Sequence, residues 1–159
     1  MNRMAVLQKI VSGGQTGADR AALDFAMEHG IPHGGWCPKG RLAEDGTIDP
    51  KYQLTETTTE IYEERTRQNV RDADGVVIFS ISPILDGGSK LTAEFATKYR
   101  KPWIHLSWQK TNDPAVELRK FIRKHNISIL NIAGSRASNE PGIYEFTRLL
   151  LSQTFGRQE

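Results

Sequence analysis

Cysteine is nearly absent from this sequence, since Cys37 is the only one among 159 residues. A single cysteine excludes a disulfide within the chain and a metal site built from a cysteine cluster. Long apolar runs are also missing, and no segment has the length and composition of a membrane-spanning helix. Residues 1–8 are too short and too polar for a secretory signal. We therefore expect a cytoplasmic protein with no membrane partner.

Clustered charge of one sign is missing as well. The formal net charge is +2, and no lysine-rich run or basic helix with interleaved aromatics occurs. Dedicated nucleic-acid binders usually show such clustering, so no nucleic-acid partner is expected. The hydrophobic fraction of 38% and charged fraction of 25% are ordinary for a folded protein. With no repeat or linker, the length predicts one domain over residues 1–159.

Short apolar segments alternate with segments of helical periodicity. Strands are predicted at residues 7–11, 75–80, 102–106 and 127–133, and helices at residues 18–29, 59–72, 90–100, 114–125 and 140–154. This order predicts an α/β fold, a single Rossmann-like domain in which helices cover both faces of a mostly parallel sheet. Residues 33–53 are predicted as a long loop, and loops of that length in compact domains are usually functional.

Three of the predicted strand-to-helix loops contain glycine and polar side chains. In a parallel sheet these loops follow the carboxyl ends of the strands, where ligands of such folds bind. Glycines allow the backbone to approach a ligand, and amides at a helix start favour phosphate. We expect a ligand-binding set made of Gly13, Gly14, Gln15, Thr16 and Gly17 in the first loop, Gly87, Gly88, Ser89 and Thr92 in the second, and Ser135 and Arg136 in the third.

Each loop also has a plainer interpretation. The first matches neither a P-loop nor a dinucleotide fingerprint, and Thr16 in a tight turn would simply cap the next helix. Ser89 is a candidate cap for the second helix, and Ser138 or Asn139 for the third. Residues 37–46 have mixed charge and form either a flap over a ligand or a surface turn. Arg65 and Asn69 share one face of a helix, which faces either the site or the solvent.

Five ordered motifs resemble one family. GGQTGADRAALD, CPKGRLAEDG, RTRQNV, DGGSKLT and NIAGSRASNEPGIY are similar to motifs of the molybdenum-cofactor carrier proteins, related to the lysine-decarboxylase-like Rossmann superfamily. The resemblance spans roughly residues 9–152. It implies a homo-oligomer, often a tetramer, that binds molybdenum cofactor, a phosphorylated pterin carrying molybdate on a dithiolene, for molybdoenzymes. By the same resemblance, the phosphate would lie against the first two glycine loops.

Two other functions stay open at this point. The second loop also resembles the PGGxGTxxE motif of phosphoribohydrolases, with Glu94 at the matching position but Asp86 in place of proline and Lys90 in place of the third glycine. A nucleoside-5′-monophosphate hydrolase using Glu94 is thus the alternative to a carrier, and a nucleotide sensor is a third possibility. The four scattered histidines and the absence of a nucleophile–base motif favour binding without catalysis, with no resident metal site.

Overall fold

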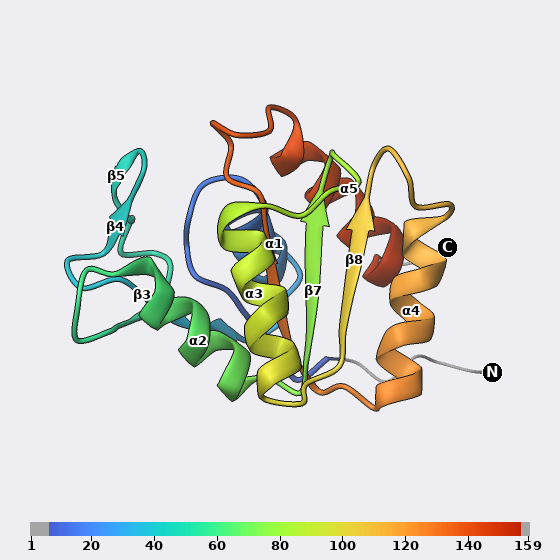
Figure 1. The fold of residues 1–159 in the computed structure, drawn as a ribbon, viewed down its shortest axis with the longest axis horizontal. Helices are drawn as coiled ribbons and strands as arrows, with labels where there is room; N and C mark the ends of the chain where they lie inside the picture. The colour runs from blue at the N-terminus through green and yellow to red at the C-terminus, as the bar shows by residue number, and fades with distance from the viewer. Residues whose placement is uncertain (1–6, 157–159) are drawn as a thin grey trace.

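Five parallel strands form the central sheet of the computed structural model, which describes residues 7–156 (Figure 1). The strand order is β2-β1-β9-β7-β8, and every neighbouring pair is parallel. The bounds are Lys9–Val11 for β1, His33–Gly34 for β2, Gly75–Ser80 for β7, Trp103–Ser107 for β8 and Ile129–Gly134 for β9. The predicted parallel sheet is therefore confirmed.

Helices cover both faces of this sheet, so the α/β, Rossmann-like prediction is also confirmed. Their bounds are Ala18–Glu28 for α1, Tyr62–Asp72 for α2, Gly87–Lys98 for α3, Pro114–His125 for α4 and Ile143–Phe155 for α5. Helices α1, α4 and α5 share one hydrophobic cluster with the sheet, whereas α2 and α3 pack on the other face. Within residues 7–156 no helix is both long and apolar enough to cross a membrane.

Strand β7 explains how the two cores are separated. All four residues of its Val-Val-Ile-Phe segment are fully buried. Successive side chains of a strand point to opposite faces, so Val77 and Phe79 join the cluster under α1 and α5, and Val76 and Ile78 join the cluster under α2 and α3. The continuous apolar run thus identified a strand buried on both faces.

The prediction of one long loop over residues 33–53 is wrong. β2 joins the edge of the main sheet, β3 (Trp36–Cys37) pairs with β6 (Thr55–Glu56), and β4 (Leu42–Ala43) pairs with β5 (Gly46–Thr47) in a small hairpin. Strands of two residues are too short to leave a periodic pattern in the sequence. The segment also has its own apolar cluster, in which Cys37 is fully buried against Leu23, Ile48 and Tyr52.

Helix starts differ from the predictions in a way that matters for the site. α3 begins at Gly87 rather than residue 90, so both glycines of the second loop lie in its first turn. The N-cap residues of α1, α3 and α5 are Gly17, Asp86 and Gly142, and none of these helices has a side-chain cap. Capping by Thr16, Ser89, Ser138 or Asn139 is therefore not what the described residues show.

Candidate functional site

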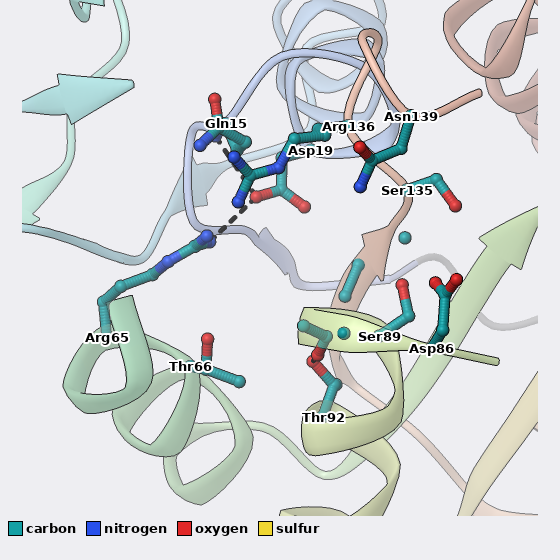
Figure 2. Close-up of a pocket in the computed structure, with 14 residues that line it drawn as sticks. Gln15, Asp19, Arg65, Thr66, Asp86, Ser89, Thr92, Ser135, Arg136 and Asn139 are labelled. Atoms are coloured by element: carbon teal, nitrogen blue, oxygen red, sulfur yellow. Dashed lines mark hydrogen bonds and ion pairs between the residues drawn. The ribbon is translucent and has the colours of Figure 1, made fainter. Parts of the chain in front are cut away.

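A pocket of about 180 Å³ opens at the carboxyl edge of the sheet (Figure 2). The strands β1, β9 and β7 are parallel neighbours, so the loops that follow them leave the same edge. The pocket walls come from all three of these loops and from α2. The predicted convergence of the three glycine loops is thus what the fold produces.

The predicted ligand-binding residues divide into two groups. Those that line the pocket are Gln15, Gly87, Gly88, Ser89, Thr92, Ser135 and Arg136. Those that do not line it are Gly13, Gly14, Thr16 and Gly17. The first loop therefore reaches the pocket through a glutamine side chain, while its glycines serve close packing.

Two of these glycines allow approaches that any side chain would block. A Cβ on Gly13 would lie 1.6 Å from Nη1 of Arg65, so the guanidinium rests directly on the backbone of the first loop. Gly17 has φ +84°, and a Cβ there would lie 2.5 Å from the carbonyl oxygen of Ser135. Glycine at these positions brings α2 and the β9 loop against the β1 loop.

Two amides of the first loop and the first amide of α1 are already hydrogen-bonded within the protein. The Gln15 amide donates to Oδ2 of Asp19 at 3.2 Å, the Thr16 amide donates to Oε1 of Gln15 at 3.0 Å, and the Ala18 amide donates to the Ser135 carbonyl at 3.2 Å. The first turn of α3 differs, because a Cβ on Gly87 or Gly88 would meet nothing within 4 Å. The open helix start at the pocket is therefore that of α3, where unpaired amides favour an anion.

A buried ion pair forms one wall of the pocket. Arg65 of α2 donates from Nη1 to Oδ2 of Asp19 at 2.9 Å, and Figure 2 shows it reaching across the pocket. The two side chains are 13% and 6% exposed, respectively. Burial raises the pKa of Asp19 above its usual value, while the nearby guanidinium acts in the opposite direction. Neither residue is among the predicted site residues, and the sequence alone leaves open whether Arg65 faces the site or the solvent.

Two buried donors at this pocket have no partner among residues 7–156. They are Nε2 of Gln15 and Nε of Arg65. Gln15 is only 5% exposed, and its other atom, Oε1, accepts from the Thr16 and Glu44 amides. These two amides fix the orientation of the side-chain amide, so that its NH₂ group is the part left over. Leaving such a donor unsatisfied costs roughly 1–3 kcal/mol.

Two of the predicted hydroxyl donors, those of Thr92 and Ser135, form hydrogen bonds with other groups of the protein. Thr92 donates to the Gly88 carbonyl at 2.9 Å, and Ser135 donates to Oε1 of Glu140 at 2.5 Å. Glu140 also accepts from the Ile81 and Ser82 amides at 3.0 and 2.7 Å, which ties the β7 loop to the β9 loop. Glu140 therefore holds the segment that leads into the open start of α3.

Residues relevant to catalysis lie elsewhere. Glu94 is exposed and does not line the pocket. The fold does bring Oγ of Ser80 to 2.5 Å from Nε2 of His105, a pairing that the sequence did not reveal. Ser80 donates its proton to the Ser82 carbonyl at 2.6 Å, so His105 must be the donor in that contact and does not act as a base towards Ser80. Asn69 holds the Trp36 backbone through bonds of 2.8 and 3.0 Å rather than facing the pocket.

Comparison with known proteins places this chain in a family. Residues 10–155 match the model of the circularly permutated YpsA SLOG family. No curated protein matches significantly. A crystal structure from Syntrophus aciditrophicus SB, described as "Putative molybdenum carrier protein", is 50% identical to this chain, with a TM-score of 0.91. The match covers 94% of this chain and 95% of that one. The resemblance found in the motifs is thus confirmed, and the chain belongs to the circularly permutated YpsA SLOG family.

Proposed function

We propose that this protein binds and carries molybdenum cofactor, that is phosphorylated molybdopterin with its metal, or a closely related nucleotide-like anion. The observation that carries the proposal is one pocket lined by Arg65, Arg136 and the first turn of α3, which has no side-chain cap. Two of the lining residues, Gln15 and Arg65, each bury one donor without a partner. The 50% identical neighbour described as a molybdenum carrier supports the same class of ligand. Cofactor and metal are cargo in this proposal, and no reaction is assigned.

The donors around the pocket suit an oxyanion. Arg65 and Gln15 present N–H groups from one side, the first turn of α3 presents backbone amides from another, and Arg136 adds a guanidinium at the wall. A hydrogen bond to a charged group contributes about 1.5–3 kcal/mol, more than one between neutral groups.

The size of the pocket indicates which part of the ligand it holds. Sites for drug-sized ligands typically enclose about 300–1,000 Å³. A pocket of about 180 Å³ is smaller and fits the phosphate end of the cofactor. In our proposal the pterin lies outside, over the open surface above Gly87 and Gly88, where no side chain fills the space.

The wider cellular role follows from the ligand. A carrier of this kind would work in the cytoplasm and deliver the cofactor to molybdoenzymes, and the family resemblance adds a homo-oligomeric assembly. The alternative hydrolase receives no support from the position of Glu94.

A charge introduced at Gln15 tests the proposal. Gln15→Glu keeps an oxygen to accept from the Thr16 and Glu44 amides but replaces the unpartnered NH₂ group with a negatively charged oxygen. Gln109→Glu is the matched control, because it makes the same chemical change at an exposed position. Affinity for cofactor released from a molybdoenzyme is measured anaerobically through pterin fluorescence.

We expect Gln15→Glu to weaken binding by about 10–100-fold, the equivalent of one charge-assisted hydrogen bond, and Gln109→Glu to leave it unchanged. Gly88→Asp is a second variant at the helix start, where a Cβ meets nothing within 4 Å and the fold should tolerate it. Equal affinity in wild type, Gln15→Glu and Gly88→Asp would show that the cofactor does not bind in this pocket.

A further inference from the structure

Next to the pocket, the protein holds one of its own carboxylates as it would hold a ligand. Glu44 lies at the tip of the β4–β5 hairpin. Its carboxylate accepts from the Thr16 hydroxyl, from the Ser138 amide at 3.2 Å and from the Ser138 hydroxyl at 2.5 Å. Nη1 of Arg136 lies 4.0 Å from Oε1 of Glu44. We refer to Thr16, Arg136 and Ser138 as the Glu44 cradle.

The composition of this cradle is that of an oxyanion site. It combines a backbone amide, two hydroxyls and a guanidinium, the donor types that proteins use for phosphate and carboxylate. Burial raises the pKa of Glu44, but the hydrogen bonds from Ser138 and Thr16 outweigh it, and the net pKa lies below its usual value. The cradle therefore favours a negatively charged occupant.

The cradle and the pocket share residues. Arg136 lines the pocket and also faces Glu44. Gln15 lines the pocket and is only 5% exposed, and its buried NH₂ group has no partner. Its Oε1 accepts from the Glu44 amide at 2.9 Å. Arg136 and Gln15 therefore lie between the open pocket and the cradle, whose donors are already occupied by Glu44.

Polar contacts fasten the tip of the hairpin to the body of the protein. Besides Glu44, Asp45 accepts from both terminal nitrogens of Arg20, at 2.7 and 3.0 Å. Both residues of β5 are exposed to solvent. Exposed ion pairs each contribute only about 0–1 kcal/mol. The hydrogen bonds to Glu44 are therefore the main contacts that a competing anion has to replace.

We propose that the Glu44 cradle is a second oxyanion subsite, that Glu44 occupies it in the absence of ligand, and that ligands carrying two separated anionic groups take it over while their other group fills the pocket. This inference rests on the proposed function and specifies its ligand class. A phosphorylated molecule with a second oxyanion belongs to that class, whereas a ligand with a single phosphate fills the pocket alone.

The test uses the full chain and inorganic phosphates as probes. Glu44→Ala empties the cradle, and Asp45→Ala is the matched control, because it removes the neighbouring carboxylate and its Arg20 pair without touching the cradle. Calorimetric titration with orthophosphate is expected to give one site in wild type and in Asp45→Ala but two in Glu44→Ala. Tripolyphosphate, which carries several linked anionic groups, is expected to bind Glu44→Ala about tenfold more tightly than wild type. Asp45→Ala should differ from wild type by less than about fivefold, because an exposed ion pair contributes only about 0–1 kcal/mol.

A second measurement follows the hairpin itself. In wild type, tripolyphosphate should accelerate amide hydrogen exchange in residues 42–47, because Glu44 leaves the cradle, whereas orthophosphate should not. A single orthophosphate site in Glu44→Ala, with unchanged affinity for tripolyphosphate, would overturn the second subsite. That result is distinct from failure of the proposed function, in which Gln15→Glu would leave cofactor binding intact.

Discussion

The buried pair of Asp19 and Arg65 allows a quantitative prediction about stability. Arg65→Met removes the guanidinium but keeps a long apolar side chain, and so leaves the Asp19 carboxylate buried without its partner. Removing one member of a buried ion pair typically costs about 3–5 kcal/mol. For a domain of this size 1 kcal/mol corresponds to roughly 2–4 °C in melting temperature, so we expect a loss of roughly 6–20 °C at pH 8.

The loss should depend on pH in a defined direction. Burial raises the pKa of Asp19 in the folded state, and Arg65 opposes that rise. Without Arg65 the folded pKa moves further above the unfolded value of about 3.9. Between these two values the folded state binds more protons than the unfolded state, so the variant loses stability as pH rises through that window. The deficit relative to wild type should therefore be smaller at pH 5 than at pH 8.

Urea denaturation at both pH values measures the deficit, and Asp19→Asn combined with Arg65→Met supplies the control. The double variant has no unpaired charge and should recover most of the stability. Its affinity for phosphate should stay below that of wild type, because the Arg65 donor is gone. A deficit below about 1 kcal/mol at pH 8, or one that does not change between pH 5 and pH 8, would refute the argument.

Two further predictions concern residues that position the site. Gly13→Ala should displace the Arg65 guanidinium, because the new Cβ would lie 1.6 Å from Nη1. We expect the free energy of unfolding to fall by about 1–3 kcal/mol in wild type and to change very little in the Asp19→Asn, Arg65→Met background. A double-mutant cycle measures this difference. Glu140→Gln should lower the free energy of unfolding by roughly 1–2 kcal/mol at pH 7. Burial raises the pKa of Glu140, but bonds from Ser135 and the Ser82 and Ile81 amides lower it overall. This stabilisation is present above the unfolded pKa and is lost as pH falls through the folded value, so thermal melts should show the cost shrinking below about pH 4.5. A cost that stays constant down to pH 3 would contradict that role for the carboxylate.

Local patterns predicted the frame of this protein well. The predicted strand over residues 75–80 coincides with β7, and the alanine-rich face predicted for residues 18–29 is fully buried along α1. Both signals come from neighbouring residues, since burial on both faces of a strand or along one face of a helix leaves a short periodic pattern. The order of these elements was enough to bring three loops to one edge of the sheet.

The contacts that give the site its character were harder to predict. Asp19 and Arg65 are 46 positions apart in the sequence, and the Thr16 hydroxyl meets a carboxylate 28 positions away. Their meeting depends on β2, β3 and the β4–β5 hairpin, whose strands of two residues have no recognisable period. The spacing of Arg65 and Asn69 correctly put them on one helix face, but their different partners depend on what lies opposite each turn of α2.

The sequence by itself determined the class of fold and the edge of the sheet at which the three glycine loops gather. These properties depend on short-range periodicity and on the direction of parallel strands. Only the tertiary structure decided which donors face the pocket. The backbone amides of Gln15 and Thr16 are satisfied internally, whereas the buried side-chain donors of Gln15 and Arg65 are not. Whether a polar atom is satisfied depends on groups that come from distant parts of the chain, and those meet only when the chain has folded.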